Sequence, residues 1–326
     1  MAGALRVYLG NSAQPSSTEA GGVASIGTFD GVHRGHQKVL TALKNWRAEI
    51  NASSAGVLTF RDHPRKTLEG RSPDLVTTLE HRLVLFERLE LDFAWVLDFT
   101  PELSRLSARE FAQTYFANGL GLRGLMMGHD SRFGHDRIGE DSPQLLDIAR
   151  EFKMEVRCQD AVAALDGGAI SSTKIREAIG EGHLRDAEAM LGRRVSVYGT
   201  VVKGDARGRR LGFHTANLDL GREFRPPFGV YATVAELNGR RYGSVSNVGY
   251  RPTIAQPDPG TKPDLLVETH LFDFDGDLYG QKMEVLFIEK LRDERRFPDV
   301  QALVEQIRKD ESRAREILSA QGILNG

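Results

Sequence analysis

The chain has 326 residues, 40% of them apolar and 27% charged, proportions that are ordinary for a globular protein. Its 43 Lys and Arg residues against 45 Asp and Glu give a net charge of −2, so no overall basic field favours nucleic acid as a partner. Membrane-spanning apolar runs and a signal peptide are not expected from the sequence, and a single cysteine, Cys158, indicates a reduced, cytoplasmic setting.

A chain of this length is long for one hydrophobic core and suits two domains. In the first half, short apolar runs alternate with stretches of helical periodicity, which is typical of a parallel sheet covered on both faces. The apolar runs predict strands at residues 23–26, 56–60, 93–99, 125–128 and 154–158. Helices are predicted to begin near His33, Ser142 and the apparent capping boxes at Thr77 and Ser107. Ligands should therefore collect where the strands end.

The segment 27–37 lies between the first of these strands and a helix, and reads Gly-Thr-Phe-Asp-Gly-Val-His-Arg-Gly-His-Gln. The first N–H groups of a helix lack partners within the helix and attract phosphate. His33 and His36 are three residues apart, so they should share one face of the first turn. The glycines let a polyanion approach the backbone. The segment therefore predicts a nucleotide-binding site.

This segment resembles the signature of the nucleotidyltransferase superfamily in the form found in flavin adenylyltransferases. The resemblance implies a Rossmann-like nucleotidyltransferase domain that joins FMN to the α-phosphorus of ATP and releases pyrophosphate. It also implies that Gly27, Phe29, His33 and His36 bind ATP, and that the two histidines are catalytic. Such a reaction needs charge neutralisation on the phosphates and no protein nucleophile.

Two later strand ends resemble further motifs of the same family. Residues 61–64 contain His63, which is either a contact for the flavin substrate or simply a loop histidine before a proline. Residues 128–134 contain Asp130, which suits a nucleotide hydroxyl or a hydrated metal ion, and Phe133, which the resemblance assigns to the flavin.

A third motif, at residues 170–176, places Ser172, Thr173 and Arg176 at a predicted helix start, where they suit the β- and γ-phosphates of ATP. Two residues depart from the family pattern. Asp62 stands where a proline is usual, and Ser131 stands where a phenylalanine is usual. These changes put the affinity for the acceptor flavin in question, but not the type of reaction.

The periodicity changes after a short helix predicted at residues 183–191, which Gly192 ends. We therefore expect a first domain at 1–185 and a second at 186–326. Closely spaced strands without intervening helices predict a small antiparallel β-barrel in the second domain, with terminal helices from residues 299–320 packed on it. Its strands are predicted at residues 195–202, 229–236, 242–248, 266–272 and 283–288.

The connection after the first barrel strand is rich in glycine. Gly204, Gly208 and Gly212 would let backbone N–H groups close around phosphates. Thr215 and Asn217 follow on one side of an extended segment, and their oxygens suit Mg²⁺. The alternative is a flexible loop with solvated arginines.

This region, with residues 247–253, 267–272, 277–280 and 291–294, is similar to riboflavin kinase. The resemblance implies that the glycines, Thr215 and Asn217 bind ATP, that Thr215 and Asn217 also hold Mg²⁺, and that Arg292 contacts the flavin. It makes Glu268 the base that takes the proton from the ribityl 5′-hydroxyl. His214 stands where a proline is usual, so the rigidity of the metal-binding segment is in question.

The whole chain thus resembles the bacterial bifunctional riboflavin kinase/FMN adenylyltransferase family, or FAD synthetases. The resemblance implies that riboflavin, FMN and ATP are the small-molecule partners, with Mg²⁺ as cofactor and FMN and FAD as products, and without nucleic acid or membrane; it leaves the oligomeric state open. Two alternatives remain: an FMN adenylyltransferase whose barrel only binds flavin, because of His214, and a non-catalytic flavin or nucleotide sensor.

Overall fold

The structure is a computed structural model that describes residues 4–164, 167–203, 215–250 and 265–323. The chain divides into two compact units. The first comprises residues 1–75 and 79–172, and the second comprises residues 76–78 and 173–326.

The first unit is built on a six-stranded parallel sheet, as the alternating pattern predicts. The strand order is β1-β4-β3-β2-β5-β6. The central strands are buried along their whole length, which explains why they read as continuous apolar runs. The strands are β1 (Arg6–Leu9), β2 (Val23–Ile26), β3 (Ala55–Phe60), β4 (Phe93–Leu97), β5 (Gly124–Gly128) and β6 (Glu155–Gln159).

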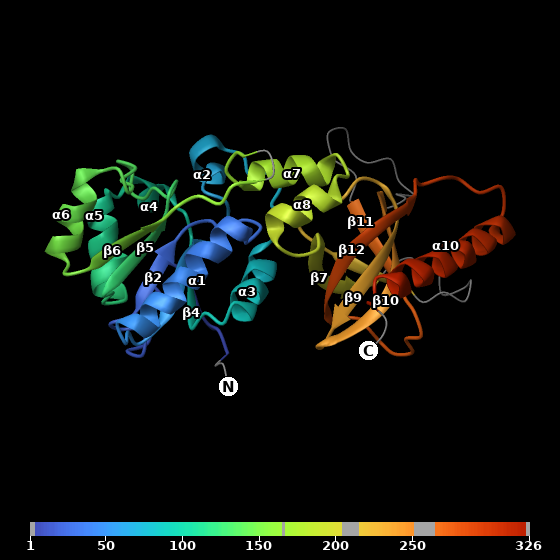
Figure 1. Cartoon of the computed structure of the whole chain (residues 1–326), viewed down its shortest axis with the longest axis horizontal. Coiled ribbons are helices and arrows are strands. Elements are labelled where there is room, and N and C mark those ends of the chain that lie inside the picture. Colours follow the sequence, from blue (N-terminus) through green and yellow to red (C-terminus); the bar gives the residue numbers. More distant parts are fainter. Residues whose placement is uncertain (1–3, 165–166, 204–214, 251–264, 324–326) are drawn as a thin grey trace. The chain divides into compact units, whose positions relative to one another are not determined.

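Helices cover both faces of this sheet (Figure 1). On one face, α1 and α3 pack through Leu40, Leu43 and Phe86 against inward residues of the central strands. On the other face, α5 contributes Phe111 and η1 contributes Phe116 to a second apolar cluster. The helices of this unit are α1 (Arg34–Glu49), α2 (Arg65–Glu69), α3 (Leu79–Arg88), α4 (Pro101–Arg105), α5 (Ala108–Phe111), the π-helix η1 (Ala112–Gly119) and α6 (Pro143–Glu151).

Two helix starts follow from local sequence. The capping box of Ser107 and Glu110 is present at α5, and His33 is the N-cap of α1. Edge strand β1 is not predicted from the sequence, because only three apolar residues, Val7 to Leu9, mark it.

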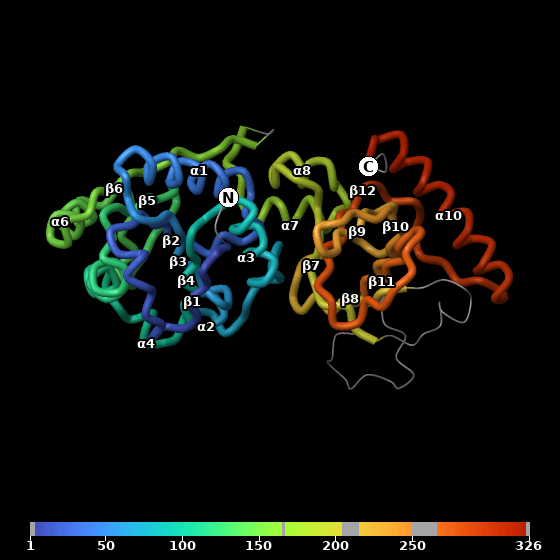
Figure 2. Tube along the Cα trace, turned by 90° about the horizontal axis from the view of Figure 1, so that it is seen from below, coloured from blue at the N-terminus to red at the C-terminus, as the bar shows by residue number. Residues whose placement is uncertain are grey.

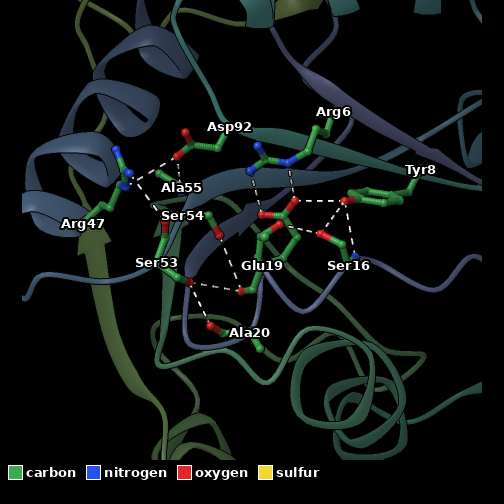
Figure 3. Close-up of polar contacts among 11 residues, drawn as sticks. Arg6, Tyr8, Ser16, Glu19, Ala20, Arg47, Ser53, Ser54, Ala55 and Asp92 are labelled. Carbon is green, nitrogen blue, oxygen red and sulfur yellow. Dashed lines mark hydrogen bonds and ion pairs between the residues drawn. The ribbon is translucent and has the colours of Figure 1, made fainter. Parts of the chain in front are cut away.

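The buried carboxylate of Glu19 is the centre of a hydrogen-bond network at the amino ends of the strands, opposite the edge where ligands are expected (Figure 3). The Glu19 side chain is 0% exposed and accepts hydrogen bonds from Arg6 Nε at 2.6 Å and from the Tyr8 hydroxyl at 2.9 Å. The bond to Glu19 raises the pKa of Arg6. The hydroxyl of Ser53 donates to the Ala20 carbonyl at 2.9 Å and thereby fastens the start of β3 to the segment before β2. This network stabilises the sheet away from the predicted site.

The second unit contains a closed six-stranded antiparallel barrel, with strand order β10-β11-β8-β7-β12-β9. Figure 2 shows α10 (Val300–Ala320) running beside it. Ala232 and Val234 of β9 pack on α10, so the alternate residue Thr233 faces the barrel interior. The strands are β7 (Ser196–Val202), β8 (Thr215–Asp219), β9 (Gly229–Leu237), β10 (Arg240–Tyr250), β11 (Leu265–Leu271) and β12 (Lys282–Arg292).

The interior of the barrel holds a chain of buried hydroxyl groups. Thr233 Oγ1 hydrogen-bonds the hydroxyls of Ser244 at 2.8 Å and Ser246 at 2.9 Å, and Ser246 bonds Thr269 at 2.8 Å. Because neighbouring residues in a strand point to opposite faces, Glu268 faces outward.

Helices α7 (Ser172–Gly180) and α8 (Leu184–Leu191) lie between the sheet and the barrel in sequence. Gly192 ends α8 in the left-handed conformation, as expected from the sequence. The terminal region forms one long helix in the described chain rather than several, because its apolar positions keep helical spacing from Val300 to Ala320. Segment 215–219, expected only to be extended, is barrel strand β8.

Candidate functional site

The carboxyl ends of β3, β2 and β5 lie side by side. From β2 the chain continues to β3 and β4 on one side of the sheet, and it then adds β5 and β6 on the other side of β2. This reversal of strand order is the place where open α/β sheets bind ligands. The loops after Ile26, Phe60 and Gly128 therefore meet at one edge, as their position at the strand ends predicts.

The loop after β2 has an unusual backbone. Phe29 has φ 50°, Val32 has φ 39° and Gly31 has φ 82°. Positive φ is unfavourable for a phenylalanine and more so for a β-branched valine, so the surrounding structure must impose it. Strain of this kind is concentrated at ligand-binding sites.

Three carbonyl oxygens of this loop accept hydrogen bonds from side chains of other elements or of the following helix. Arg82 donates to the Thr28 carbonyl, Ser172 Oγ to the Asp30 carbonyl at 2.9 Å, and Gln37 Nε2 to the Val32 carbonyl at 2.8 Å. In a trans peptide the N–H of the next residue points the opposite way from the carbonyl. These bonds therefore fix the orientation of three peptide groups of the loop, including the N–H groups of Phe29, Gly31 and His33.

His33 and His36 form a stacked pair at the start of α1. Their ring centroids are 3.6 Å apart with an angle of 19° between planes, and Phe29 meets His36 edge-on at 5.3 Å. His33 Nδ1 accepts a hydrogen bond from the His36 backbone N–H at 3.4 Å, which makes Nε2 the donor nitrogen of a neutral ring. A Cβ on Gly35 would lie 3.1 Å from the His33 ring, so glycine permits this stack.

Behind the loop lies Arg82 of α3, which sequence reasoning missed. It is 3% exposed, and besides Thr28 it binds Thr59 Oγ1 at 3.0 Å and the Phe60 carbonyl at 2.9 Å. Burial lowers the pKa of its guanidinium to about 10, although the charges of Asp30 and Asp62 partly oppose the shift. Helical spacing gives no hint of this role, since an arginine on a helix normally reaches solvent.

The remaining residues predicted for this site are placed as follows. His63 Nδ1 accepts from the Arg65 backbone N–H at 3.2 Å and so shapes the turn after β3. Asp130 is exposed after β5, with His129 Nδ1 3.6 Å from its carboxylate. Phe133 is buried against Phe116, with ring centroids 5.5 Å apart.

The structure brings Ser172 to the loop of His33 through the Asp30 carbonyl. Thr173 and Arg176 follow in the chain and belong to the second unit. There Arg176 Nη2 lies 3.2 Å from Thr173 Oγ1, within hydrogen-bonding distance.

A second group of predicted residues meets on the outer face of the barrel. Glu268 of β11 lies directly opposite Asn217 of β8, and Thr215 Oγ1 donates to Glu268 Oε1 at 2.5 Å. On the other side, Glu268 pairs with Asn247 of β10, whose Nδ2 donates to Glu294 at 3.0 Å. Thr215, Asn217 and Glu268 thus form one cluster, although they are about 50 residues apart in sequence.

Arg292, predicted to contact the flavin, forms an ion pair with Asp310 of α10, with its Nη2 2.8 Å from Oδ2. Gly204, Gly208, Gly212 and His214 lie outside the described residues. Within the described residues, no group of three or more His, Cys, Asp and Glu side chains is arranged to hold a metal ion. No helix among these residues is long and apolar enough to cross a membrane.

Comparison with known proteins gives matches for both units. Residues 16–174 match the FAD synthetase family, and residues 191–318 match the riboflavin kinase family. A bifunctional riboflavin kinase/FMN adenylyltransferase from Pseudomonas fluorescens is 36% identical over 298 residues, 91% of this chain and 93% of that protein. The enzyme of the same name from Bacillus subtilis is 34% identical over 299 residues, 91% and 92% of the two chains.

Among solved structures, one described as a macrolide-efflux protein from Streptococcus pneumoniae superposes with a TM-score of 0.78 at 29% identity. It covers 95% of this chain and 99% of that chain, so the likeness includes both units.

A parallel α/β sheet unit that matches FAD synthetases and a β-barrel unit that matches riboflavin kinases define a nucleotide-dependent transferase with two catalytic domains. The relatives exceed 30% identity and match nearly their whole length. The chain belongs to the bifunctional riboflavin kinase/FMN adenylyltransferase family.

Proposed function

We propose that this protein makes FAD from riboflavin in two ATP-dependent steps. The barrel unit phosphorylates riboflavin to FMN and releases ADP, and the sheet unit transfers AMP from ATP to FMN and releases pyrophosphate. The observation that carries this proposal is the presence of both family matches in one chain whose relatives are named for both activities. ATP is then the co-substrate, and FMN and FAD are the products.

In the adenylyltransferase step, a phosphate oxygen of FMN attacks the α-phosphorus of ATP and the bond to the β-phosphate breaks. The protein must hold two polyanions together and neutralise the leaving pyrophosphate. We assign His33 and His36 to the ATP phosphates, and Gly27 and Phe29 to the wall of the same site. The stacking of the two rings at a helix start supports this assignment.

The third motif supplies further ligands for ATP in this proposal. Ser172, Thr173 and Arg176 would hold the β- and γ-phosphates, and Asp130 a nucleotide hydroxyl or a hydrated metal ion. The bond from Ser172 to the Asp30 carbonyl supports a common site for the first and third motifs.

In the kinase step, Glu268 accepts the proton of the ribityl 5′-hydroxyl as that oxygen attacks the γ-phosphorus of ATP. We propose that Thr215 and Asn217 hold Mg²⁺, and that Gly204, Gly208 and Gly212 wrap the phosphates. The hydroxyl, amide and carboxylate oxygens clustered on β8 and β11 fit a hard cation that retains waters. Mg²⁺, when bound, neutralises charge on the transferred phosphoryl group.

His63, Phe133 and Arg292 are assigned to the flavin by resemblance, and the burial of Phe133 and the ion pair of Arg292 give each a second, structural role. We also propose that the two activities divide near residue 185, and that the protein acts in the cytoplasm, given its single cysteine.

The test is to incubate the full-length protein with ATP and Mg²⁺ and either riboflavin or FMN, and to separate the flavin products by chromatography. We expect FMN and then FAD from riboflavin, and FAD alone from FMN. FAD from FMN but no product from riboflavin would support the alternative of an adenylyltransferase with an impaired kinase, which His214 suggests. No product from either substrate would contradict both enzymatic functions.

A further inference from the structure

We propose that Arg82 is a positioning residue for the adenylyltransferase step, holding the ends of β2 and β3 in register and placing a buried positive charge behind the phosphate site. This inference rests on the proposed function of the sheet unit. Neither the sequence motifs nor the family matches assign a role to this residue.

The hydrogen bonds of Arg82 connect two separate strand ends. Nη1 donates to the Thr28 carbonyl and to Thr59 Oγ1 at 3.0 Å, and Nη2 donates to the Phe60 carbonyl at 2.9 Å. Thr28 begins the loop that leads to His33, and Phe60 precedes the loop that contains His63. One rigid guanidinium therefore fixes the distance between the loop assigned to ATP and the loop assigned to FMN.

The bond to Thr28 also acts on the strained loop. Phe29, the next residue, has φ 50°, and such a conformation persists only where neighbouring contacts enforce it. Arg82 holds the carbonyl of Thr28, the residue before Phe29, and Ser172 holds the carbonyl of Asp30, the residue after it. Removing the guanidinium should let the Thr28–Phe29 peptide rotate and displace the stacked histidines.

The charge of Arg82 is costly to bury and is not matched by a carboxylate in contact. All three of its acceptors are uncharged, and its Nε is buried with no hydrogen-bond partner among the described residues. A neutral side chain would avoid this desolvation cost. A cation retained at this edge of the sheet would attract polyanions that bind there, because the low-dielectric interior only weakly screens the attraction between the guanidinium and the phosphates.

The experiment compares Arg82→Met and Arg82→Lys with the wild-type protein, using purified full-length chains. Arg88→Met, a change at an exposed position of the same helix, is the matched control. Steady-state kcat and KM are measured for FAD formation from FMN and ATP, and FMN formation from riboflavin serves as an internal control. Thermal unfolding and near-ultraviolet circular dichroism report whether the sheet unit is folded.

We expect Arg82→Met to lower kcat/KM for FAD formation about 100-fold, mainly through kcat, with FMN formation within about twofold of wild type. Arg82→Lys should have a kcat/KM about tenfold higher than that of Arg82→Met, since lysine restores the positive charge but not the planar set of donors of the guanidinium.

The inference is overturned if folded Arg82→Met keeps near-wild-type kcat/KM while the wild-type protein forms FAD normally. If the Met variant does not fold, Thr59→Val decides, because it removes one acceptor of Arg82 and keeps the charge. A fall of about fivefold in kcat/KM for FAD formation is then expected, and unchanged activity overturns the proposal. A wild-type protein that makes no FAD from FMN would instead refute the proposed function.

Discussion

At the scale of single residues, the two proposed centres differ in how their key side chains are held. His33 is buried at the N-cap of α1 and stacks on His36, so its position depends on the backbone of one loop. Glu268 depends on strand register, because its neighbours Asn217 and Asn247 come from two other strands. Substitutions at these residues should therefore affect different reactions.

We predict that His33→Ala removes FAD formation and leaves FMN formation within about twofold of wild type, and that Glu268→Gln does the reverse, each with a loss of about 100-fold or more. Initial rates with FMN or riboflavin as the starting flavin measure the two steps. Loss of both steps in one variant with unchanged thermal unfolding would contradict separate centres.

Cys158 gives a prediction about pH, because it is the only cysteine in the chain. Cys158 lies at the surface of β6, where partial desolvation, and then the hydrogen bond and charge of Glu140, raise the pKa of its thiol to about 11, from an ordinary value of 9.0. The neutral thiol is therefore favoured in the folded state. This contribution to stability is fully present below pH 9 and is lost as the pH rises toward 11.

Alkylation by iodoacetamide at pH 8 should accordingly be at least about tenfold slower for the folded protein than for the chain unfolded in urea, because the thiolate is the nucleophile. Glu140→Gln should speed the reaction of the folded protein, but by less than unfolding does. Equal rates for the folded and unfolded chains at pH 8 would show that the thiol pKa is not raised.

At the scale of elements, the attachment of α10 to the barrel combines an apolar seam with one partly buried ion pair. Ile317 and Leu318 pack on the outward residues of β9, while Asp310 binds Arg292 of β12. Asp310 is further held by Gln306 Nε2 at 2.7 Å. Removing the carboxylate leaves a guanidinium that is only 20% exposed without its partner.

We predict that Asp310→Ala lowers the free energy of unfolding by about 3 kcal/mol, measured by urea denaturation followed by circular dichroism. Glu305→Ala, at an exposed position on the same helix, should change it by less than about 0.5 kcal/mol. If Arg292 acts mainly through this pair, Asp310→Ala should also reduce kinase activity. Unchanged stability would show that the Arg292–Asp310 pair contributes little to the attachment of α10.

At the scale of the whole molecule, the sheet and the barrel form two compact units, and each carries one of the two proposed catalytic centres. Both steps need ATP, and the product of the first is the substrate of the second. If the two centres work independently, FMN released by one molecule can be used by another.

We predict that mixing the His33→Ala and Glu268→Gln proteins restores FAD formation from riboflavin, after a lag in which FMN accumulates. Each protein alone should form less than about 5% of the FAD made by the mixture, given losses of about 100-fold in one step. The time course of both flavins, followed by chromatography, provides the measurement. Absence of FAD from the mixture would mean that FMN does not exchange between molecules.

Much of the fold could be predicted from sequence because its signals are local. The apolar runs that became β2 to β6, the capping box at Ser107 and the helix stop at Gly192 each depend on residues within one turn or strand. Strand β1 is not predicted because its apolar run is only three residues long, and Val7 and Leu9 in it are exposed at the sheet edge. The single helix α10 was expected as several because its charges obscure its continuity.

The sequence by itself determined which chemistry is present at each strand end, since motifs such as 27–36 are contiguous and strand ends of a parallel sheet must meet. Only the tertiary structure decided which distant residues support them. Arg82 lies on a helix that follows both loops, yet packing turns it inward to hold Thr28 and Phe60. Likewise, the register of β8 on β11 sets Glu268 beside Thr215, because strand pairing is a long-range choice that no local pattern contains.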